Sequence, residues 1–156
     1  MTMQEKEQFL RSEYSRKLTA LDPATPPKWG KMNVQQMIEH MAEYIRMGYG
    51  EPEYTTTITP EEHIPKMQAF VMSDRPFREN TPNSLLPDMP SPAKHLSVND
   101  SITELRDAVS TLFSRFNDQP ELTVVNPFFG RLNYEMTVNL LHKHAWHHLK
   151  QFGVAE

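Results

Sequence analysis

The sequence predicts an all-α protein, a four-helix bundle with a long, irregular, proline-rich connection between its second and fourth helical segments. Three observations predict it. Apolar residues recur at helical spacing in several segments, typical capping residues flank these segments, and most prolines lie between them. At 156 residues the chain is predicted to be a single domain, residues 1–156, which is long enough to bury a core.

The first two predicted helices precede the irregular connection. One is predicted over residues 4–20, because apolar residues recur every fourth position and a proline follows. Its apolar face consists of Leu10, Tyr14 and Leu18. The next runs from Asn33, an N-cap whose capping-box partner is Gln36, to Gly48. Its apolar face consists of Val34, Met37, Met41 and Ile45.

Two further helices are predicted after the connection. One begins at Ser101, with Glu104 as its capping-box partner. Its apolar residues are Ile102, Leu105, Val109, Leu112, Phe113 and Phe116. The last helix begins near Asn133 and ends at Gly153, a residue type that favours the position just after a helix.

The remaining segments show weaker patterns. Residues 55–59 (TTTIT) suit an extended conformation, and residues 60–71 suit a short helix with prolines in its first turns. Residues 73–98 contain five prolines and are predicted to form an irregular flap. Residues 122–125 (LTVV) suit a short strand, and residues 126–130 (NPFFG) a turn that places two aromatic side chains.

Composition excludes several functions. The net charge is −4 and the basic residues are scattered, so we expect no nucleic-acid partner and no salt-dependent binding of duplex DNA. No apolar run approaches 18 residues, which argues against a membrane span or signal peptide and favours a cytoplasmic protein. Without cysteine, metal ligands must be nitrogen or oxygen atoms, and a reactive thiol must come from another molecule.

Four of the seven histidines lie in residues 140–153, LLHKHAWHHLKQFG. At about 100° per residue, His144 and His148 lie on one strip of the helix together with Gln151. His142 points away from this strip and is expected to face solvent. Two imidazoles at i, i+4 can bind one divalent ion, but the same spacing also occurs in polar helices without a metal.

A further histidine, His40, lies on the second predicted helix at the edge of its apolar face, between the directions of Gln36 and Tyr44. Inward-facing positions of a bundle meet in its core. His40 together with two histidines of the last helix would give a three-nitrogen metal site with open positions. The alternative is that His40 is a core residue hydrogen-bonded to a carbonyl group. The residue pattern leaves both interpretations open.

The segments WGKMN and MIEHM, followed about a hundred residues later by NPFFG and HKHAWHHLKQFG, resemble the DinB/YfiT-like superfamily of bacterial metalloenzymes. More narrowly, they are similar to a branch described as a domain of unknown function. The likeness extends from Trp29 to Gly153, with Asn126 departing from the histidine expected in many relatives. The resemblance implies a four-helix bundle that holds a divalent metal through three histidines. The matching positions are His40, His144 and His148.

The resemblance also implies a chemistry, because the superfamily includes transferases and isomerases that use bacillithiol, mycothiol or glutathione. We therefore predict a metal-dependent transferase that activates a low-molecular-weight thiol for attack on a small-molecule electrophile. Zn, Ni and Fe all suit three imidazoles, so the sequence does not select among them. Relatives often form dimers, so the resemblance implies a homodimer. No catalytic residue is assigned.

Three residues near the candidate ligands have predicted supporting roles. Gln151 is a candidate hydrogen-bond partner for a ligand or the thiol, and Glu43 a candidate acceptor that fixes an imidazole tautomer. Tyr44 is a candidate substrate contact. Five aromatic residues either line a pocket or pack in the core: Trp29, Tyr44, Phe128, Phe129 and Tyr134.

Two other functions remain alternatives. The first is hydrolysis of a small substrate by metal hydroxide, which needs a proton acceptor that the sequence does not place. The second is a non-catalytic binding or stress-response module in which the metal is structural. A zincin-type peptidase is excluded because Ala145 occupies the position of the required glutamate, and no nucleophile elbow, Walker loop or dinucleotide fingerprint is present.

Overall fold

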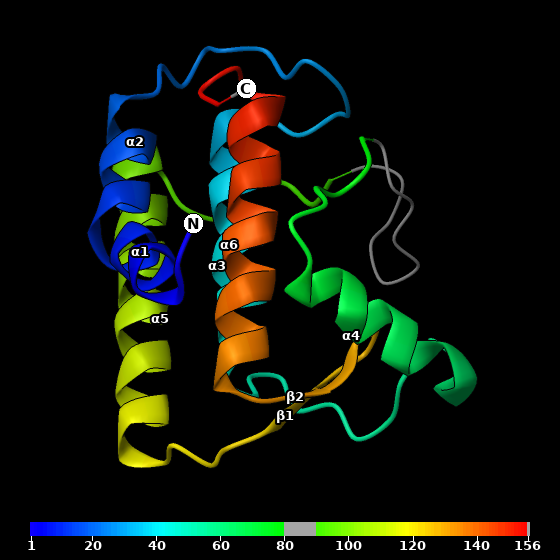
Figure 1. Cartoon of the computed structure of the whole chain (residues 1–156). Coiled ribbons are helices and arrows are strands. Elements are labelled where there is room, and N and C mark those ends of the chain that lie inside the picture. The colour runs from blue at the N-terminus through cyan, green and yellow to red at the C-terminus, as the bar shows by residue number, and fades with distance from the viewer. Residues whose placement is uncertain (80–89, 156) are drawn as a thin grey trace.

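The computed structural model describes residues 1–79 and 90–155, and this part of the chain is mostly helical with one small two-stranded sheet (Figure 1). The elements in chain order are α1 (Met3–Gln8), the π-helical turn η1 (Phe9–Glu13), α2 (Tyr14–Ala20), α3 (Val34–Met47), the 3-10 turn η2 (Glu61–His63), α4 (Ile64–Met72), α5 (Val98–Asp118), β1 (Val124–Asn126), β2 (Gly130–Leu132) and α6 (Tyr134–Gln151). The prediction of a predominantly helical chain is confirmed. No described helix has both the length and the apolar character that a membrane crossing requires.

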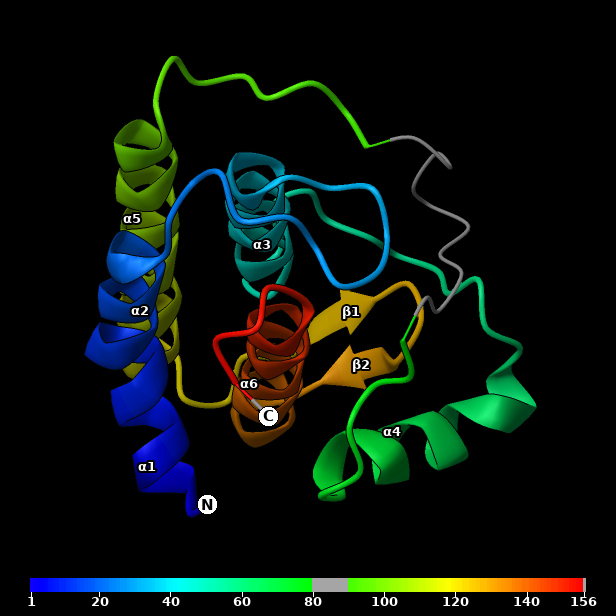
Figure 2. The same ribbon diagram turned by 90° about the horizontal axis from the view of Figure 1, so that it is seen from above.

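The long helices lie side by side (Figures 1 and 2). α5 packs against α2 and α3, whereas α6 packs against α1 and α3. The hairpin β1–β2 and α4 lie on the side of α3 and α6 that faces away from α5 (Figure 2). α4 packs against α6. The histidines of α6 therefore have different neighbours, because α1 packs on one side of the helix and α4 on another.

Two separate apolar clusters hold the elements together. The larger lies between the long helices, where Met37 and Met41 of α3 and Leu105 and Leu112 of α5 are almost fully buried. Their spacing of four residues in α3 and seven in α5 places them on the inner face of each helix. The smaller cluster joins α4, the hairpin and α6. Its buried members are Val71, Phe129, Leu132 and Leu140.

The predicted caps of α3 and α6 are confirmed. The side chain of Asn33 accepts a hydrogen bond from the backbone nitrogen of Gln36 at 2.8 Å, and the side chain of Gln36 accepts from the backbone nitrogen of Asn33 at 2.9 Å. Asn133 caps α6 in the same position. Gly153 follows α6 with φ of 76°, in the left-handed region that favours glycine.

The predicted start of α5 is too late in the chain. The helix begins at Val98, and Ser97 is its N-cap. Ser101 is buried within the helix, and its hydroxyl donates a hydrogen bond to the Glu39 carboxylate at 2.8 Å. Glu104 forms ion pairs with side chains outside the helix instead of a capping box. Ser101 therefore forms a hydrogen bond with Glu39 on α3, whereas the local sequence pattern predicts that it caps α5.

The predicted turn at NPFFG is confirmed. β1 and β2 pair antiparallel with Asn126 opposite Gly130, so only part of the predicted strand at residues 122–125 is regular. The Asn126 Oδ1 accepts hydrogen bonds from the backbone nitrogens of Phe128 at 2.8 Å and Phe129 at 3.1 Å. This side chain therefore closes the turn that places both aromatic rings.

The irregular connection agrees with prediction in part. A helix forms within residues 60–71 and extends by one residue, whereas residues 55–59 form no strand. Of the predicted flap at residues 73–98, residues 80–89 lie outside the described residues. Its described remainder has no helix or strand before α5.

Candidate metal centre

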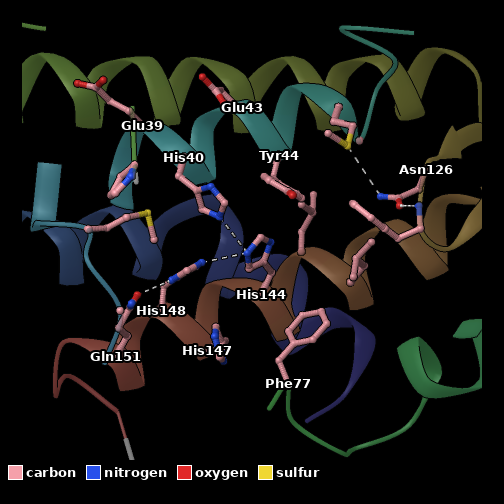
Figure 3. A pocket seen from close by; sticks show the side chains of 18 of the residues that line it. Glu39, His40, Glu43, Tyr44, Phe77, Asn126, His144, His147, His148 and Gln151 are labelled. Atoms are coloured by element: carbon pink, nitrogen blue, oxygen red, sulfur yellow. Dashed lines mark hydrogen bonds between the residues drawn. The ribbon is translucent and has the colours of Figure 1, made fainter. Parts of the chain in front are cut away.

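Three histidines from two helices meet where α3 faces α6 (Figure 3). His40 lies in the middle of α3, whereas His144 and His148 lie one turn apart in the second half of α6. The Nε2 of His144 lies 3.3 Å from the Nε2 of His40 and 3.0 Å from the Nε2 of His148. Within the described residues these form the one group of three or more potential metal ligands, with ligand atoms all within 4.8 Å of one another.

The three imidazoles are neutral at neutral pH. Burial, together with a smaller effect of the nearby His147, lowers the pKa of His40 to about 4. Burial also lowers the pKa of His144 and of His148 well below 6.5, and the neighbouring imidazoles add to the effect. Because a metal binds the unprotonated nitrogen, no proton has to be displaced from an imidazolium before binding.

Gln151 fixes the orientation of His148. Its side-chain nitrogen donates to the carbonyl oxygen of Trp29 at 2.9 Å, which leaves its side-chain oxygen to accept from the Nδ1 of His148 at 2.7 Å. His148 therefore carries its proton on Nδ1, and its Nε2 presents a lone pair to the other two imidazoles. The predicted contact between Gln151 and a candidate ligand is present.

Two of the three nitrogen pairs have a spacing that suits a divalent cation. Bonds of about 2.0–2.1 Å in a tetrahedral site place imidazole nitrogens roughly 3.3–3.4 Å apart, close to the separations of 3.0 and 3.3 Å, while all the ligand atoms lie within 4.8 Å of one another. With the proton of His148 on Nδ1, neutral imidazoles can form a hydrogen bond across only one of these two contacts. A single cation would satisfy both contacts at once.

The loop before α3 is shaped to receive Gln151. Gly30 has φ of 77°, and a Cβ atom at this position would lie 2.9 Å from the side-chain nitrogen of Gln151. The backbone nitrogen of Lys28 donates to the carbonyl oxygen of Gln151 at 2.7 Å. A residue with a side chain at position 30 would therefore both strain the backbone and push Gln151 away from His148.

Replacing Gln151 by leucine is expected to weaken metal binding by about 10–100-fold, the usual cost of losing the partner that orients a metal-binding imidazole. Competition titration against a chromophoric chelator measures this affinity. The exposed residue Gln4 on α1 provides the control, because Gln4→Leu removes the same group far from the cluster. Equal affinities of the two variants would contradict the orienting role.

The other predicted supporting residues differ in their placement. The Tyr44 ring lies against two imidazoles, with its centroid 4.7 Å from that of His40 and 4.7 Å from that of His144. Glu43 is exposed and points away from the cluster (Figure 3). No hydrogen bond joins Glu43 to any of the three histidines, which are all among the described residues.

The cluster forms part of the wall of a cavity of about 1350 Å³ that α3, α4, α6, the hairpin and neighbouring loops enclose. Four of the five aromatic residues considered from sequence line this cavity: Trp29, Tyr44, Phe128 and Phe129. Tyr134 does not line it. Its ring packs instead against Phe116 in the larger core, with centroids 5.2 Å apart.

Phe77 and His147 are cavity residues next to the cluster to which the sequence assigned no role. The Phe77 ring lies 5.7 Å from that of His144 and 5.8 Å from that of His147. His147 also forms a hydrogen bond with the backbone of Phe77. His147 could have been considered from sequence, because it lies next to His148. Phe77 could not, because it lies in an irregular segment without a periodic pattern.

The expectation that His142 faces solvent is wrong. Its ring stacks on Trp146 with centroids 6.0 Å apart and meets the edge of Phe9 at 5.2 Å. The reason is that α1 covers this side of α6, so the face opposite the cluster is also packed. Of the remaining histidines, His95 pairs with Glu104 at 2.6 Å, and His63 is exposed.

Comparison with known proteins identifies a family that the chain matches. A family model described as the DinB superfamily matches residues 12–152 of the chain. No curated protein and no solved structure matches the chain. The matched range includes all three histidines of the cluster, the hairpin and α4.

Proposed function

The chain belongs to the DinB superfamily, and on this premise we propose that it is a metal-dependent transferase that activates a low-molecular-weight thiol for attack on a small electrophile. His40, His144 and His148 are the proposed ligands of a divalent Zn, Ni or Fe ion. The observation that carries the proposal is the convergence of three neutral imidazoles on the wall of a large cavity.

The proposal includes the architecture of the family. The N-terminal helical segment with α3, α5 and α6 forms the proposed four-helix bundle, and residues 1–156 form one domain. In this arrangement α3 and α6 supply the ligands from rigid elements, which holds them in fixed positions. The described parts of the predicted flap, residues 73–79 and 90–98, are proposed to cover the cavity. Six of their residues line it, which supports this placement: Phe77, Arg78, Pro90, Ser91, Pro92 and Lys94.

A bound divalent ion supplies a Lewis acid that lowers the pKa of a nearby thiol. The thiol sulfur forms a bond to the electrophilic carbon, the leaving group departs with its electron pair, and the thiol proton passes to solvent. The protein's residues hold and orient: Gln151 keeps the Nε2 of His148 turned towards the cluster, and Tyr44 packs against two of the imidazoles.

The surroundings favour thiol transfer over hydrolysis. Hydrolysis needs a proton acceptor for water, most often a histidine and otherwise a carboxylate. In the described part of the cavity lining, His147 is the one imidazole outside the candidate ligands, and it already forms a hydrogen bond with the backbone of Phe77. Of the two carboxylates that line the cavity among the described residues, Glu39 is occupied by hydrogen bonds and Glu43 points away from the cluster. A thiol ionises more readily than water and depends less on such an acceptor.

Conjugation of an activated aryl halide with glutathione or bacillithiol tests the proposal. The expected result is product formation that requires both the thiol and a loaded divalent ion, measured by absorbance with and without chelation. Product from the halide and water alone would favour the hydrolase. No product, together with a large fall in melting temperature on chelation, would favour a structural metal in a non-catalytic module.

A further inference from the structure

One side of the cavity is a continuous apolar surface, here termed the aromatic wall. Its members belong to α4, to the segment after α4, to the hairpin turn and to α6, and they also pack in or against the smaller core. They are Met67, Phe70, Phe77, Phe128, Phe129 and Leu140. A wall of this kind offers a ligand dispersion contacts and burial of apolar surface, and no hydrogen bonds from its side chains.

The aromatic wall begins at the histidine cluster. The Phe77 ring lies 5.7 Å from that of His144. It also lies 5.5 Å from the ring of Phe70 and 6.4 Å from that of Phe129. A molecule with its reactive end at the imidazoles would therefore have the rings of Phe77, Phe70 and Phe129 available along its length.

Several members of the wall keep exposed surface in the cavity. Met67, Phe70, Phe77 and Phe128 are only half-buried, although they pack against the smaller core. At about 1350 Å³ the cavity also exceeds the roughly 300–1,000 Å³ that is typical of small-molecule sites. A compact polar electrophile would leave most of this apolar surface in contact with water.

We infer that the electrophile has an extended apolar body, an alkyl or aryl chain of several carbon atoms, that lies along the aromatic wall with its reactive end at the imidazoles. The inference rests on the proposed function for the identity of the reacting end. The apolar body is recognised by the wall itself, and this recognition does not depend on the metal.

A series of straight-chain alkyl hydroxamates tests the inference, because the hydroxamate group ligates divalent metals and the alkyl chain can be lengthened one carbon at a time. Isothermal titration of the metal-loaded full chain should show Kd falling about fourfold per methylene over several carbons, as expected for full burial. A Kd that does not change with chain length would overturn the inference.

Variants locate the effect. Phe77→Ala should reduce the gain per methylene, and Phe128→Ala provides an independent change on the hairpin. Leu96→Ala is the control, because Leu96 is fully exposed and does not line the cavity. A gain per methylene that is unchanged in both phenylalanine variants, with folding verified by circular dichroism, would contradict binding along the wall.

Failure of the inference and failure of the proposed function give different results. In His144→Ala the hydroxamate group should lose its contribution to binding, while the gain per methylene persists. If wild-type protein binds no metal but still shows that gain, the proposed function fails and the wall remains assigned. If thiol conjugation requires metal but shows no dependence on chain length, the inference alone fails.

Discussion

Replacing His144 by alanine is expected to abolish stoichiometric metal binding. His144 is the central member of the cluster, since its Nε2 makes both of the short contacts, at 3.0 and 3.3 Å. Two imidazoles on different helices would remain, without the atom that lies between them. The loss of affinity should exceed the roughly 10–100-fold that a lost orienting partner costs. Elemental analysis of freshly purified protein measures the metal content.

His142→Ala is the matched control for this experiment. His142 lies on the same helix and packs against Phe9 and Trp146 on the opposite side. Its removal should lower stability through lost packing, while metal content stays at the wild-type value. An unchanged metal content in His144→Ala would remove the basis of the proposed enzymatic function.

Replacing Glu39 by alanine is expected to destabilise the protein by about 1–3 kcal/mol. The buried carboxylate accepts hydrogen bonds from the backbone nitrogen of Lys94 at 2.8 Å, the backbone nitrogen of His95 at 3.3 Å and the hydroxyl of Ser101 at 2.8 Å. Of these donors only the Ser101 hydroxyl is buried, and the loss of its carboxylate partner costs about 1–3 kcal/mol, whereas the two backbone nitrogens lie in a partly exposed segment that water can reach. Urea unfolding measures the difference in the free energy of unfolding.

The pKa of Glu39 supports this expectation. Burial alone would raise it, but hydrogen bonds from Lys94, Ser101, His95 and Gln35 outweigh burial and hold it below the usual value. The folded state therefore favours the charged carboxylate. Glu43→Ala is the control, because it removes an exposed carboxylate one turn further along α3 and should change stability by no more than about 0.5 kcal/mol. Similar losses in the two variants would refute the role of Glu39.

Local signals in the sequence predict much of the fold. Asn33, Gln36 and Asn133 satisfy backbone groups within four residues of themselves, so their roles depend only on nearby residues. The i, i+4 spacing of His144 and His148 likewise places both on one strip of α6. Their contact with His40 forms only when α3 and α6 pack together. The expectation that these three histidines form one site came from the family resemblance.

Long-range contacts explain what the sequence analysis misplaced. Ser101 has the residue type of a cap, but the carboxylate of Glu39 lies within reach of its hydroxyl only after α3 and α5 pack. His142 is polar and lies opposite the cluster, but α1 covers that face. Phe77 has no periodic pattern around it, so only the folded chain places its ring beside His144. In each case the deciding neighbour is remote in sequence.

The candidate metal ligands belong to helices, whereas much of the aromatic wall belongs to connecting segments. The three histidines are fixed in the interior of α3 and α6, whereas Phe77 and Phe128 lie in connecting segments. Connecting segments accept substitutions and insertions more readily than packed helices do. Substitutions in these connecting segments can therefore change the lining of the cavity while the three candidate ligands stay in place, an arrangement that favours divergence of the lining during evolution.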